Sequence, residues 1–342
     1  MTKFLIVGAG AIGGFLGAVL SRENSYQVTM IARGAHLQAM KKNGLHVKLN
    51  SLSKTPESFV ATRINYAANL QDSLKYGPFD VVFLCVKAQQ LIDIARDPYW
   101  LKTLHDRTIL VPLQNGLPWY LFLSRPASDP FHGIRLKSVD PTGELEKAFE
   151  TRRIVGCIAM PASTLVEPGV IDHEHGWSFP LPADPQAKIV AELISKVGFR
   201  PKCHENFEEE LWLKSLGSAI FNPVSALTGA VLGEFADDPK IVAFTYKVMN
   251  EVRSVASAIG ITIPVTNEKR LQGATRIGDH KTSMLQDVEA GKPSLEIDAL
   301  VASVVEVAEI AKVNVPTLEV ILNLVRMKQR SLAREAAKKA KL

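Results

Sequence analysis

The chain has 342 residues, of which 46% are hydrophobic and 22% charged, and its formal net charge is +5 at pH 7. That length exceeds one usual hydrophobic core, so two domains are expected. The composition excludes a disordered or fibrous chain, the modest charge gives no reason to expect nucleic acid as a partner, and no apolar run reaches the roughly 18 residues of a membrane span.

The chain opens on a strand that leads directly into a glycine-rich turn. Residues 4–7 are apolar, as in a strand buried on both faces, and residues 8–13 have the spacing Gly-x-Gly-x-x-Gly before an apolar helix. In a dinucleotide site the first glycine permits a tight turn, the second has no Cβ to block the pyrophosphate, and the third lets the helix pack closely on the strand. The expected cofactor contacts are Gly8, Gly10, Ala11, Ile12 and Gly13. The alternative is a turn without a ligand.

A second strand is predicted over residues 27–33. About 20 residues past the glycines an NAD site usually has Asp or Glu for the ribose 2′-hydroxyl, but this chain has Arg33 there. A guanidinium can hold the 2′-phosphate of NADP through two hydrogen bonds, so we expect NADPH as the cofactor. The alternative is a solvated arginine on a loop.

The elements that follow are short. They are a helix at 35–43, strands at 45–49, 62–66, 80–87 and 108–116, a surface loop at 126–137, a strand at 153–160, a hairpin at 169–179 turning near Gly176, a helix at 187–197 and a strand at 199–203. Lys87 and Asn115 end two buried strands, where open parallel sheets bind ligands. We expect Lys87 to meet cofactor phosphate or ribose and Asn115 to lie near the nicotinamide. A surface lysine and a simple turn are the alternatives.

No metal site is expected. The three cysteines (Cys85, Cys157 and Cys203) have no metal-ligand spacing, and His173 and His175 lack further ligands. Three cysteines that lie far apart in the sequence favour the reducing cytoplasm, and the first strand begins too early for a cleavable signal peptide. The C-terminal Ala-Lys-Leu resembles a peroxisomal address, but in a tail rich in Ala and Lys chance explains it better.

Long helical periods replace the strands after about residue 205. The expected helices span 207–227, 239–259, 264–276, 294–311 and 316–340. The predicted domains are therefore an α/β dinucleotide-binding domain over 1–204 and an all-helical substrate domain over 205–342, which ends in a basic tail at 331–342.

The first of these helices carries a polar stripe. Lys214, Ser218 and Asn222 recur every four positions and so share one helix face, whose flanks are apolar. A lysine on such a face is costly to bury without an anionic partner. This favours a cleft at the domain boundary over the alternative, a lysine that snorkels from a solvated face.

A second polar constellation follows at residues 280–298. Ser283 begins a helical turn, and Glu296 lies after a Pro-Ser break, in the first turn of the next helix. The helix dipole favours a carboxylate there whatever its function. Helix capping therefore explains Glu296 and Asp298 about as well as a role in a site does.

Together these motifs resemble the ketopantoate reductase (2-dehydropantoate 2-reductase) family. The segments that carry the resemblance are 8–14, 86–88, 113–116, 212–222, 283–287 and 295–298. It implies an α/β fold in which an N-terminal Rossmann-type doubly wound sheet precedes an all-helical domain like that of 6-phosphogluconate dehydrogenase. It also implies NADPH-dependent reduction of a 2-oxo acid, from 2-dehydropantoate to pantoate, as in pantothenate biosynthesis.

The resemblance makes Lys214 the general acid, with Glu296 beside it in the active site. The other implied contacts are Asn115, Ser218, Asn222 and Ser283 for the substrate, and Arg33, Lys87 and Asn115 for NADPH. Ser218 stands where the family often has Asn, and an Asn-Gly pair common after the Glu-Ile-Asp segment is absent. These departures leave the identity of the oxo acid open.

Two other functions are compatible with the sequence. The nearer is a related NADP-dependent oxidoreductase that acts on another 2-oxo acid or forms an opine-like product. The farther is a non-catalytic NADP-sensing module, which gives no reason for the Lys214 stripe. A homodimer is compatible with the sequence, but no motif indicates one.

Overall fold

The structure, a computed structural model, describes residues 1–49 and 57–339. It divides into two compact units, Met1–Gln114 with Glu144–Phe207, and Asn115–Gly143 with Glu208–Leu342. The sequence predicted a single boundary after residue 204. The structure differs because the segment 115–143 packs with the helical unit. Four of its apolar side chains lie in that unit's core: Leu117, Leu121, Phe122 and Leu136.

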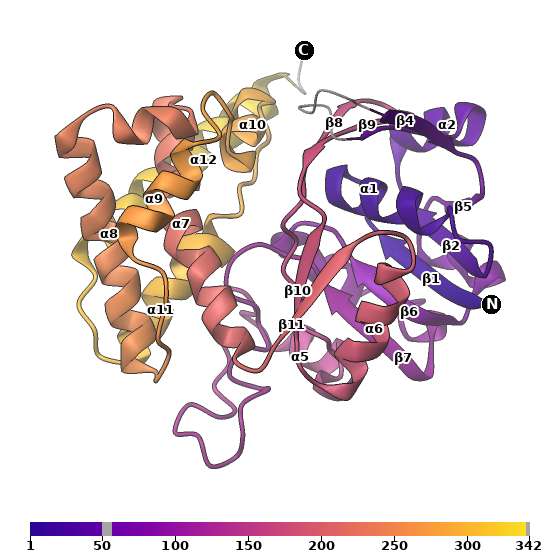
Figure 1. Cartoon of the computed structure of the whole chain (residues 1–342), viewed down its shortest axis with the longest axis horizontal. Helices are drawn as coiled ribbons and strands as arrows, with labels where there is room; N and C mark the ends of the chain where they lie inside the picture. The colour runs from indigo at the N-terminus through magenta and orange to yellow at the C-terminus, as the bar shows by residue number, and fades with distance from the viewer. Residues whose placement is uncertain (50–56, 340–342) are drawn as a thin grey trace. The chain divides into compact units, whose positions relative to one another are not determined.

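A five-stranded parallel sheet forms the centre of the first unit (Figure 1). Its strands are β1 (Thr2–Val7), β2 (Tyr26–Ile31), β5 (Ile64–Ala67), β6 (Phe79–Leu84) and β7 (Leu104–Pro112), in the order β5-β2-β1-β6-β7. The strand order reverses at β1, which pairs in parallel with β2 on one side and β6 on the other. Ligands of doubly wound sheets bind at the carboxyl ends of the strands at such a reversal. The predicted Rossmann-type sheet is confirmed.

The helix α1 (Ala11–Leu20) lies between this sheet and a second one. The second sheet has the order β4-β3-β9-β8, with β3 (Leu45–Leu49), β4 (Glu57–Ala61), β8 (Ala162–Glu167) and β9 (Val170–His175). On one side α1 contacts β1 and β2, and on the other it contacts β3, β8 and β9. All of its residues from 13 to 20 are consequently buried. This double burial explains why the helix is apolar all round.

The first unit also contains further helices and strands. They are α2 (Gly34–Asn43), α3 (Leu70–Ser73), α4 (Leu91–Ala95), α5 (Glu144–Ala148), α6 (Pro185–Ser195), β10 (Ser178–Pro182) and β11 (Arg200–His204). The predicted hairpin across Gly176 is wrong. Gly176 does turn the chain, with φ +90°, but β9 pairs with β3 and β8 whereas β10 pairs with β11. The hairpin joins β8 to β9 instead, and the sequence analysis did not predict β8.

Two other strand predictions need correction. The predicted strand at 153–160 does not form, because its backbone changes partner along the way. The Val155 N–H donates to the Leu110 carbonyl oxygen, whereas the Ile158 N–H donates to that of Pro180. The predicted strand at 62–66 forms with shifted bounds as β5, which begins at residue 64, because β4 ends at residue 61 in a different sheet.

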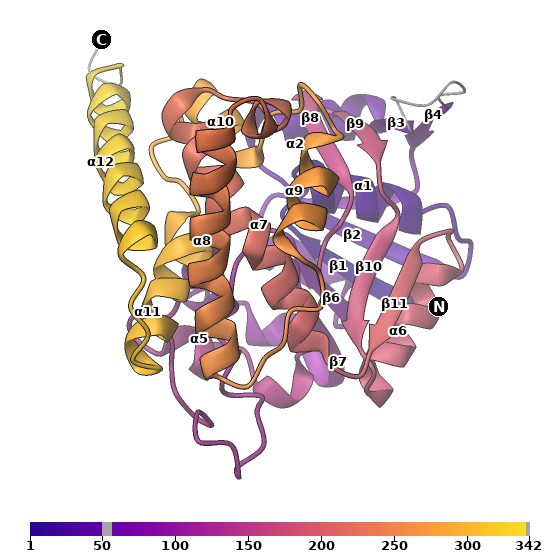
Figure 2. The same ribbon diagram turned by 60° about the vertical axis from the view of Figure 1, so that its left-hand side comes forward.

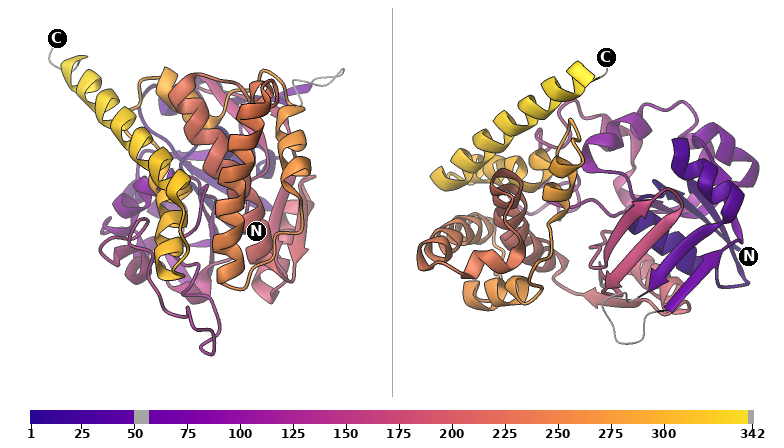
Figure 3. Two further views of the ribbon diagram at one scale, coloured as in Figure 1. Left: turned by 90° about the vertical axis from the view of Figure 1, so that its left-hand side faces the viewer. Right: turned by 90° about the horizontal axis from the view of Figure 1, so that it is seen from above.

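The second unit is all-helical, as predicted (Figure 2). Its helices are α7 (Phe207–Thr228), α8 (Pro239–Ala258), α9 (Asn267–Thr275), α10 (Ser283–Glu289), the π-helical turn η6 (Asp298–Ala302), α11 (Ser303–Ile310) and the long C-terminal α12 (Pro316–Lys339), drawn in yellow in Figure 3. α9 starts later than predicted because Thr266 caps it, its side chain accepting from the Lys269 N–H. The predicted helix end at 340 and the terminal Ala-Lys-Leu fall outside the described residues. Over the described ranges, no helix has both the length and the apolar character needed to cross a membrane.

Candidate active site

The first and third glycines of the turn after β1 each have a steric reason. Gly8 has φ +102°, which side chains rarely adopt. A Cβ on Gly13 would collide with the Gly8 carbonyl oxygen, whereas a Cβ on Gly10 would meet nothing within 4 Å. The turn is therefore close-packed at its first and third glycines and open at its second, as a phosphate cradle requires.

The first turn of α1 suits an anion. Gly10 is its N-cap residue and provides no side-chain cap, and no acidic residue lies in the first turn. The N–H groups that begin a helix have no partner within the helix, and the helix dipole places positive charge there. Ala11, Ile12 and Gly13 thus fit the pyrophosphate of a dinucleotide.

Arg33 follows β2 as the N-cap residue of α2, and its side chain is exposed. The glycine turn is fastened to this end of β2, because the Ala9 N–H donates to the Ile31 carbonyl oxygen at 3.0 Å. Arg33 therefore lies two residues beyond an anchored strand end. Its contact with a cofactor phosphate stays a prediction.

The sequence analysis missed His36, which ties the glycine turn to two other segments. Its Nε2 lies 2.7 Å from the Ala9 carbonyl oxygen, and the Gly169 N–H donates to its Nδ1 at 2.9 Å. These two bonds require the proton on Nε2. Burial lowers the pKa of His36, which favours the neutral ring. No sequence signal marks this role, because Gly169 is 133 residues away in the chain.

Gln114 holds the turn that carries Lys87. Its Nε2 donates to the carbonyl oxygens of Leu84 and Val86, at 2.8 and 2.9 Å. The end of β6 is thereby fixed to the residues after β7. Lys87 is half-buried and lies three residues past the end of β6, so it follows the strand instead of ending it as predicted.

The residues after Asn115 pack against the segment that follows Glu296, within the helical unit. Gly116 has φ +85°, and a Cβ there would collide with the carbonyl group of Ala299 in η6. The Leu117 N–H donates to the same carbonyl oxygen at 3.0 Å. Since Ala299 comes three residues after Glu296, the half-buried Asn115 stands beside the segment that Glu296 begins.

The polar stripe on α7 is half-buried at Lys214 and Asn222 and buried at Ser218. Lys214 is half-buried between the fully buried Trp212 and Leu216, and Ser218 is 8% exposed. Among the described residues the Ser218 hydroxyl finds no hydrogen-bond partner. A buried hydroxyl without a partner costs about 1–3 kcal/mol, which a polar ligand atom would offset.

The structure joins Asn222 to Ser283, as one polar pair from two helices. The Ser283 hydroxyl donates to Asn222 Oδ1 at 3.3 Å, and Asn222 Nδ2 reaches the Ser218 carbonyl oxygen at 3.5 Å. Ser283 is the exposed first residue of α10, which Thr282 caps through the Leu285 N–H. Two neutral side chains from α7 and α10 can therefore act on one ligand group.

Glu296 is buried, at 7% exposure, in the turn before η6. Its neighbours Leu295 and Ile297 belong to the same apolar cluster as Trp212 and Leu216 of α7. A buried carboxylate in apolar surroundings requires a hydrogen-bonding or oppositely charged partner. Asp298 differs, because it forms an ion pair with Arg326 at 2.8 Å and so has a structural role.

The first of the two histidines of β9 packs in the core of the first unit. His173 is fully buried, stacks on the Phe15 ring with centroids 3.9 Å apart, and lies 3.1 Å from the Ser163 hydroxyl through Nδ1. Burial lowers its pKa to about 4, so the ring is neutral. No group of three or more potential His, Cys, Asp or Glu ligands occurs among the residues that the structure describes.

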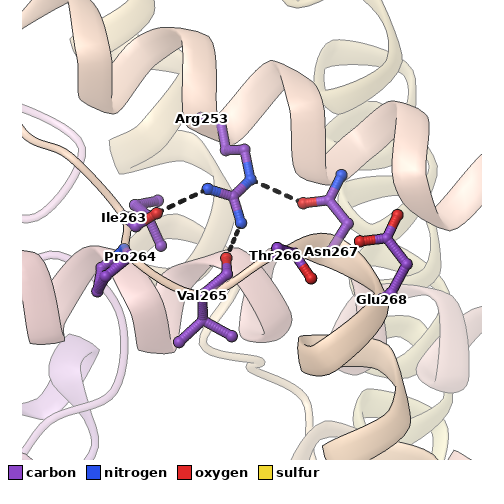
Figure 4. A pocket seen from close by; sticks show the side chains of 7 residues that line it. All are labelled: Arg253, Ile263, Pro264, Val265, Thr266, Asn267 and Glu268. Carbon is purple, nitrogen blue, oxygen red and sulfur yellow. Dashed lines mark hydrogen bonds between the residues drawn. The ribbon is translucent and has the colours of Figure 1, made fainter.

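A separate hollow of about 290 Å³ lies in the helical unit around Arg253 (Figure 4). The guanidinium donates to the carbonyl oxygens of Ile263 and Val265 and to Asn267 Oδ1. The residues that line it include none of the predicted site residues. The N–H groups of the Arg253 guanidinium are used to fix the segment at the start of α9.

A parallel sheet with a phosphate-type glycine turn and an all-helical unit with a buried, lysine-bearing polar stripe together define a Rossmann-type oxidoreductase. Two family profiles match, "Ketopantoate reductase PanE/ApbA" over residues 4–125 and "Ketopantoate reductase PanE/ApbA C terminal" over residues 206–329. The chain belongs to the ketopantoate reductase family, whose members are nicotinamide-dependent oxidoreductases.

Individual relatives agree with this assignment. A 2-dehydropantoate 2-reductase of Mesorhizobium japonicum is 36% identical over 329 residues, which cover 95% of this chain and 97% of the relative. A crystal structure from Ralstonia solanacearum MolK2, provisionally named a ketopantoate reductase, has a TM-score of 0.85 at 34% identity and covers 96% of this chain and 98% of its own. D-mandelate dehydrogenase, solved with NADH and anilino(oxo)acetate, shares the fold with a TM-score of 0.79 at 20% identity, over 97% of this chain and 99% of its own.

Proposed function

We propose that this protein uses NADPH to reduce a 2-oxo acid to the 2-hydroxy acid, and that the pair is 2-dehydropantoate and pantoate, as cytoplasmic pantothenate biosynthesis requires. One observation carries the proposal. The stripe on α7 consists of the half-buried Lys214 and Asn222 on either side of the buried Ser218, and Ser283 of α10 extends it, with the Ser218 hydroxyl left for a ligand. The relative that is 36% identical is named for this reaction.

The chemistry follows from residue types. Ketone reduction adds a hydride to the carbonyl carbon and builds negative charge on its oxygen, which a positioned ammonium stabilises. When bound, NADPH supplies the hydride. Lys214 donates the proton that converts this oxygen to a hydroxyl group. Glu296 balances the charge of Lys214 and accepts a hydrogen bond from a substrate hydroxyl, while Asn222 and Ser283 orient the carboxylate.

The first unit supplies every proposed cofactor contact except Asn115, which belongs to the second unit. The open Gly10 and the uncapped start of α1 suit the pyrophosphate, and Arg33 at the end of β2 suits a 2′-phosphate. Lys87 and Asn115 follow β6 and β7, where the ribose and nicotinamide of a bound dinucleotide would lie. Because D-mandelate dehydrogenase was solved with NADH, the choice between the two cofactors needs its own measurement.

A second candidate function is reduction of a different 2-oxo acid. Ser218 favours it, because a serine is shorter than the asparagine usual in this family and its hydroxyl lacks a partner among the described side chains. A shorter residue leaves more room in the pocket. The shared fold with D-mandelate dehydrogenase is compatible with a larger substrate.

Initial rates with NADPH on a panel of 2-oxo acids test both candidates. The panel contains 2-dehydropantoate, 2-oxoisovalerate, pyruvate and phenylglyoxylate. We expect the highest kcat/KM for 2-dehydropantoate. A higher value for another acid supports the second candidate, and no NADPH oxidation with any of them contradicts an oxidoreductase function.

We also propose a homodimer. The exposed face of α12 carries Val320, Leu324 and Met327, which are 58%, 42% and 58% exposed and recur at helical spacing. An apolar stripe of this kind is typical of an association surface. Light scattering of the parent and of Leu324→Glu tests it. A monomeric parent contradicts the proposal.

A further inference from the structure

The guanidinium of Arg270, on α9, lies directly against α7 beside the Lys214 stripe. A Cβ built on Gly217 would run into this group, with Nε only 2.8 Å away, so the space is open to the guanidinium only because residue 217 is glycine. The guanidinium carbon also lies 5.6 Å from the centroid of the Phe221 ring. Gly217 and Phe221 follow Lys214 by three and seven positions, which places all three on one helix face.

Arg270 has no carboxylate partner in the described part of the chain. Burial lowers the pKa of its guanidinium, and no acidic group offsets that effect. The buried Arg125 and Arg153 behave differently, because each pairs with a glutamate. An arginine stays charged in proteins, and a partly desolvated charge without a counter-ion is costly.

The position of α9 is well fixed. Arg253 bonds the segment 263–265 to Asn267, and Thr266 caps the helix (Figure 4). Leu271, which follows Arg270, is buried in the core cluster that includes Leu216 of α7. Arg270 is therefore held at its place by the fold, and the guanidinium is not a mobile surface group.

We propose that Arg270 binds the carboxylate of the 2-oxo acid and so selects an anionic substrate at the Lys214 site. The assignment rests on the proposed function. In a 2-oxo acid the ketone oxygen and the carboxylate are on adjacent carbons. The Arg270 guanidinium lies against position 217 of α7, and positions 214 and 217 are neighbours about 5–6 Å apart on one helix face, so the ammonium and the guanidinium match that arrangement. Arg270 adds the charge that the neutral Asn222 and Ser283 cannot supply, and its planar fork suits a carboxylate.

The test compares charged and neutral substrates. The best 2-oxo acid and its methyl ester are assayed at saturating NADPH with the parent, Arg270→Gln, Arg270→Lys and the control Lys269→Gln. Lys269 is the adjacent, exposed cation on α9, so the control removes the same charge outside the site. We expect Arg270→Gln to raise KM for the acid roughly ten- to a hundredfold and to leave the ester within about threefold of the parent. Arg270→Lys should restore part of the affinity, and Lys269→Gln should change neither substrate.

A second variant moves the guanidinium without removing it. Gly217→Ala places a methyl group against Arg270, so it should also raise KM for the acid selectively. Melting temperature and NADPH affinity are measured for every variant, which separates this effect from misfolding. Equal losses for acid and ester, or no loss for either in a folded Arg270→Gln protein, would overturn the assignment.

Calorimetry with oxamate, a carboxylate that is not reduced, and with neutral oxamide separates this assignment from the proposed function. If the parent binds oxamate through Arg270 but reduces no 2-oxo acid, the proposed function fails and the anion site stands. If the parent reduces 2-oxo acids and Arg270→Gln changes neither the oxamate affinity nor the KM for the acid, the anion site fails and the proposed function stands. A parent that neither binds oxamate nor reduces an oxo acid contradicts both.

Discussion

The imidazole of His36 donates a hydrogen bond from Nε2 to the carbonyl oxygen of Ala9, 2.7 Å away, in the middle of the glycine turn. The same ring accepts from the Gly169 N–H at the end of the β8–β9 hairpin. The shape of the turn after β1 therefore depends on a side chain from α2. His36 is a positioning residue for whatever the turn binds.

We expect His36→Leu to weaken NADPH binding by roughly two- to tenfold, the effect of losing one net hydrogen bond that holds the turn. Because burial lowers the pKa of His36, its contribution is complete above its ordinary value near 6.5 and is lost as pH falls, when Nδ1 becomes a donor facing an N–H. Fluorescence titrations from pH 8 to 5 measure both effects. His46→Leu, on the exposed face of β3, is the control, and identical pH profiles for all three proteins would contradict this role.

His173 should make the protein sensitive to acid. Its pKa is about 4 in the folded state and about 6.5 in the unfolded state, so its stabilisation is complete above pH 6.5 and declines as pH falls toward 4. The loss amounts to at most about 3 kcal/mol in the free energy of unfolding. His173→Phe keeps a ring against Phe15 and should flatten this decline in urea denaturation curves. If its slope against pH equals that of the parent and of His46→Phe, the buried imidazole is not responsible.

Arg33→Ala should weaken NADPH binding by roughly ten- to a hundredfold and leave NADH nearly unchanged, because a charge-assisted contact to the 2′-phosphate is worth about 1.5–3 kcal/mol. Lys42→Ala removes an exposed charge from the same helix and serves as the control. Dissociation constants for both cofactors decide the matter. Equal losses for NADPH and NADH would show that Arg33 does not read the 2′-phosphate.

Glu296→Gln distinguishes a role in the site from a role at a helix start. A capping role predicts a loss of no more than about 1 kcal/mol in stability with kinetics intact. We expect the opposite, a large fall in kcat/KM with the melting temperature nearly unchanged. Asp298→Asn is the comparison, since it removes an ion pair to Arg326 and should affect stability more than rate. Unchanged kinetics in a less stable Glu296→Gln protein would favour capping.

Lys214→Ala should lower kcat by about 10² to 10⁴, the usual contribution of a positioned acid, and should barely change NADPH affinity. Lys214→Arg retains the charge but donates a proton poorly, so some substrate binding and little turnover should return. Lys240→Ala, exposed on α8, is the control. A kcat within a few-fold of the parent would make Lys214 structural, and a water near Ser218 or Asn115 would be the next acid to test.

Local patterns in the sequence were enough for the individual strands of the parallel sheet, the glycine turn and the α7 stripe, because each depends on residues a few positions apart. Strand pairing was different. The turn at Gly176 is visible in the sequence, but whether β9 pairs with β8 or β10 depends on contacts made elsewhere in the fold. The same limit hid His36 and Arg270, whose partners lie more than 25 positions away in the chain.

The segment 115–143, which belongs to the helical unit, limits how the two units can be expressed separately. It leaves the Rossmann unit after Gln114, supplies core side chains to the helical unit and returns at Glu144. Arg125, buried within it, forms an ion pair with Glu208 at the start of α7 and donates to the Ile259 carbonyl oxygen. A fragment cut at residue 205 would lack those side chains and leave Glu208 without its arginine. The helical unit should therefore be insoluble when expressed from 205 onward, and a soluble version would have to carry residues 115–143 grafted onto its N-terminus through a designed linker.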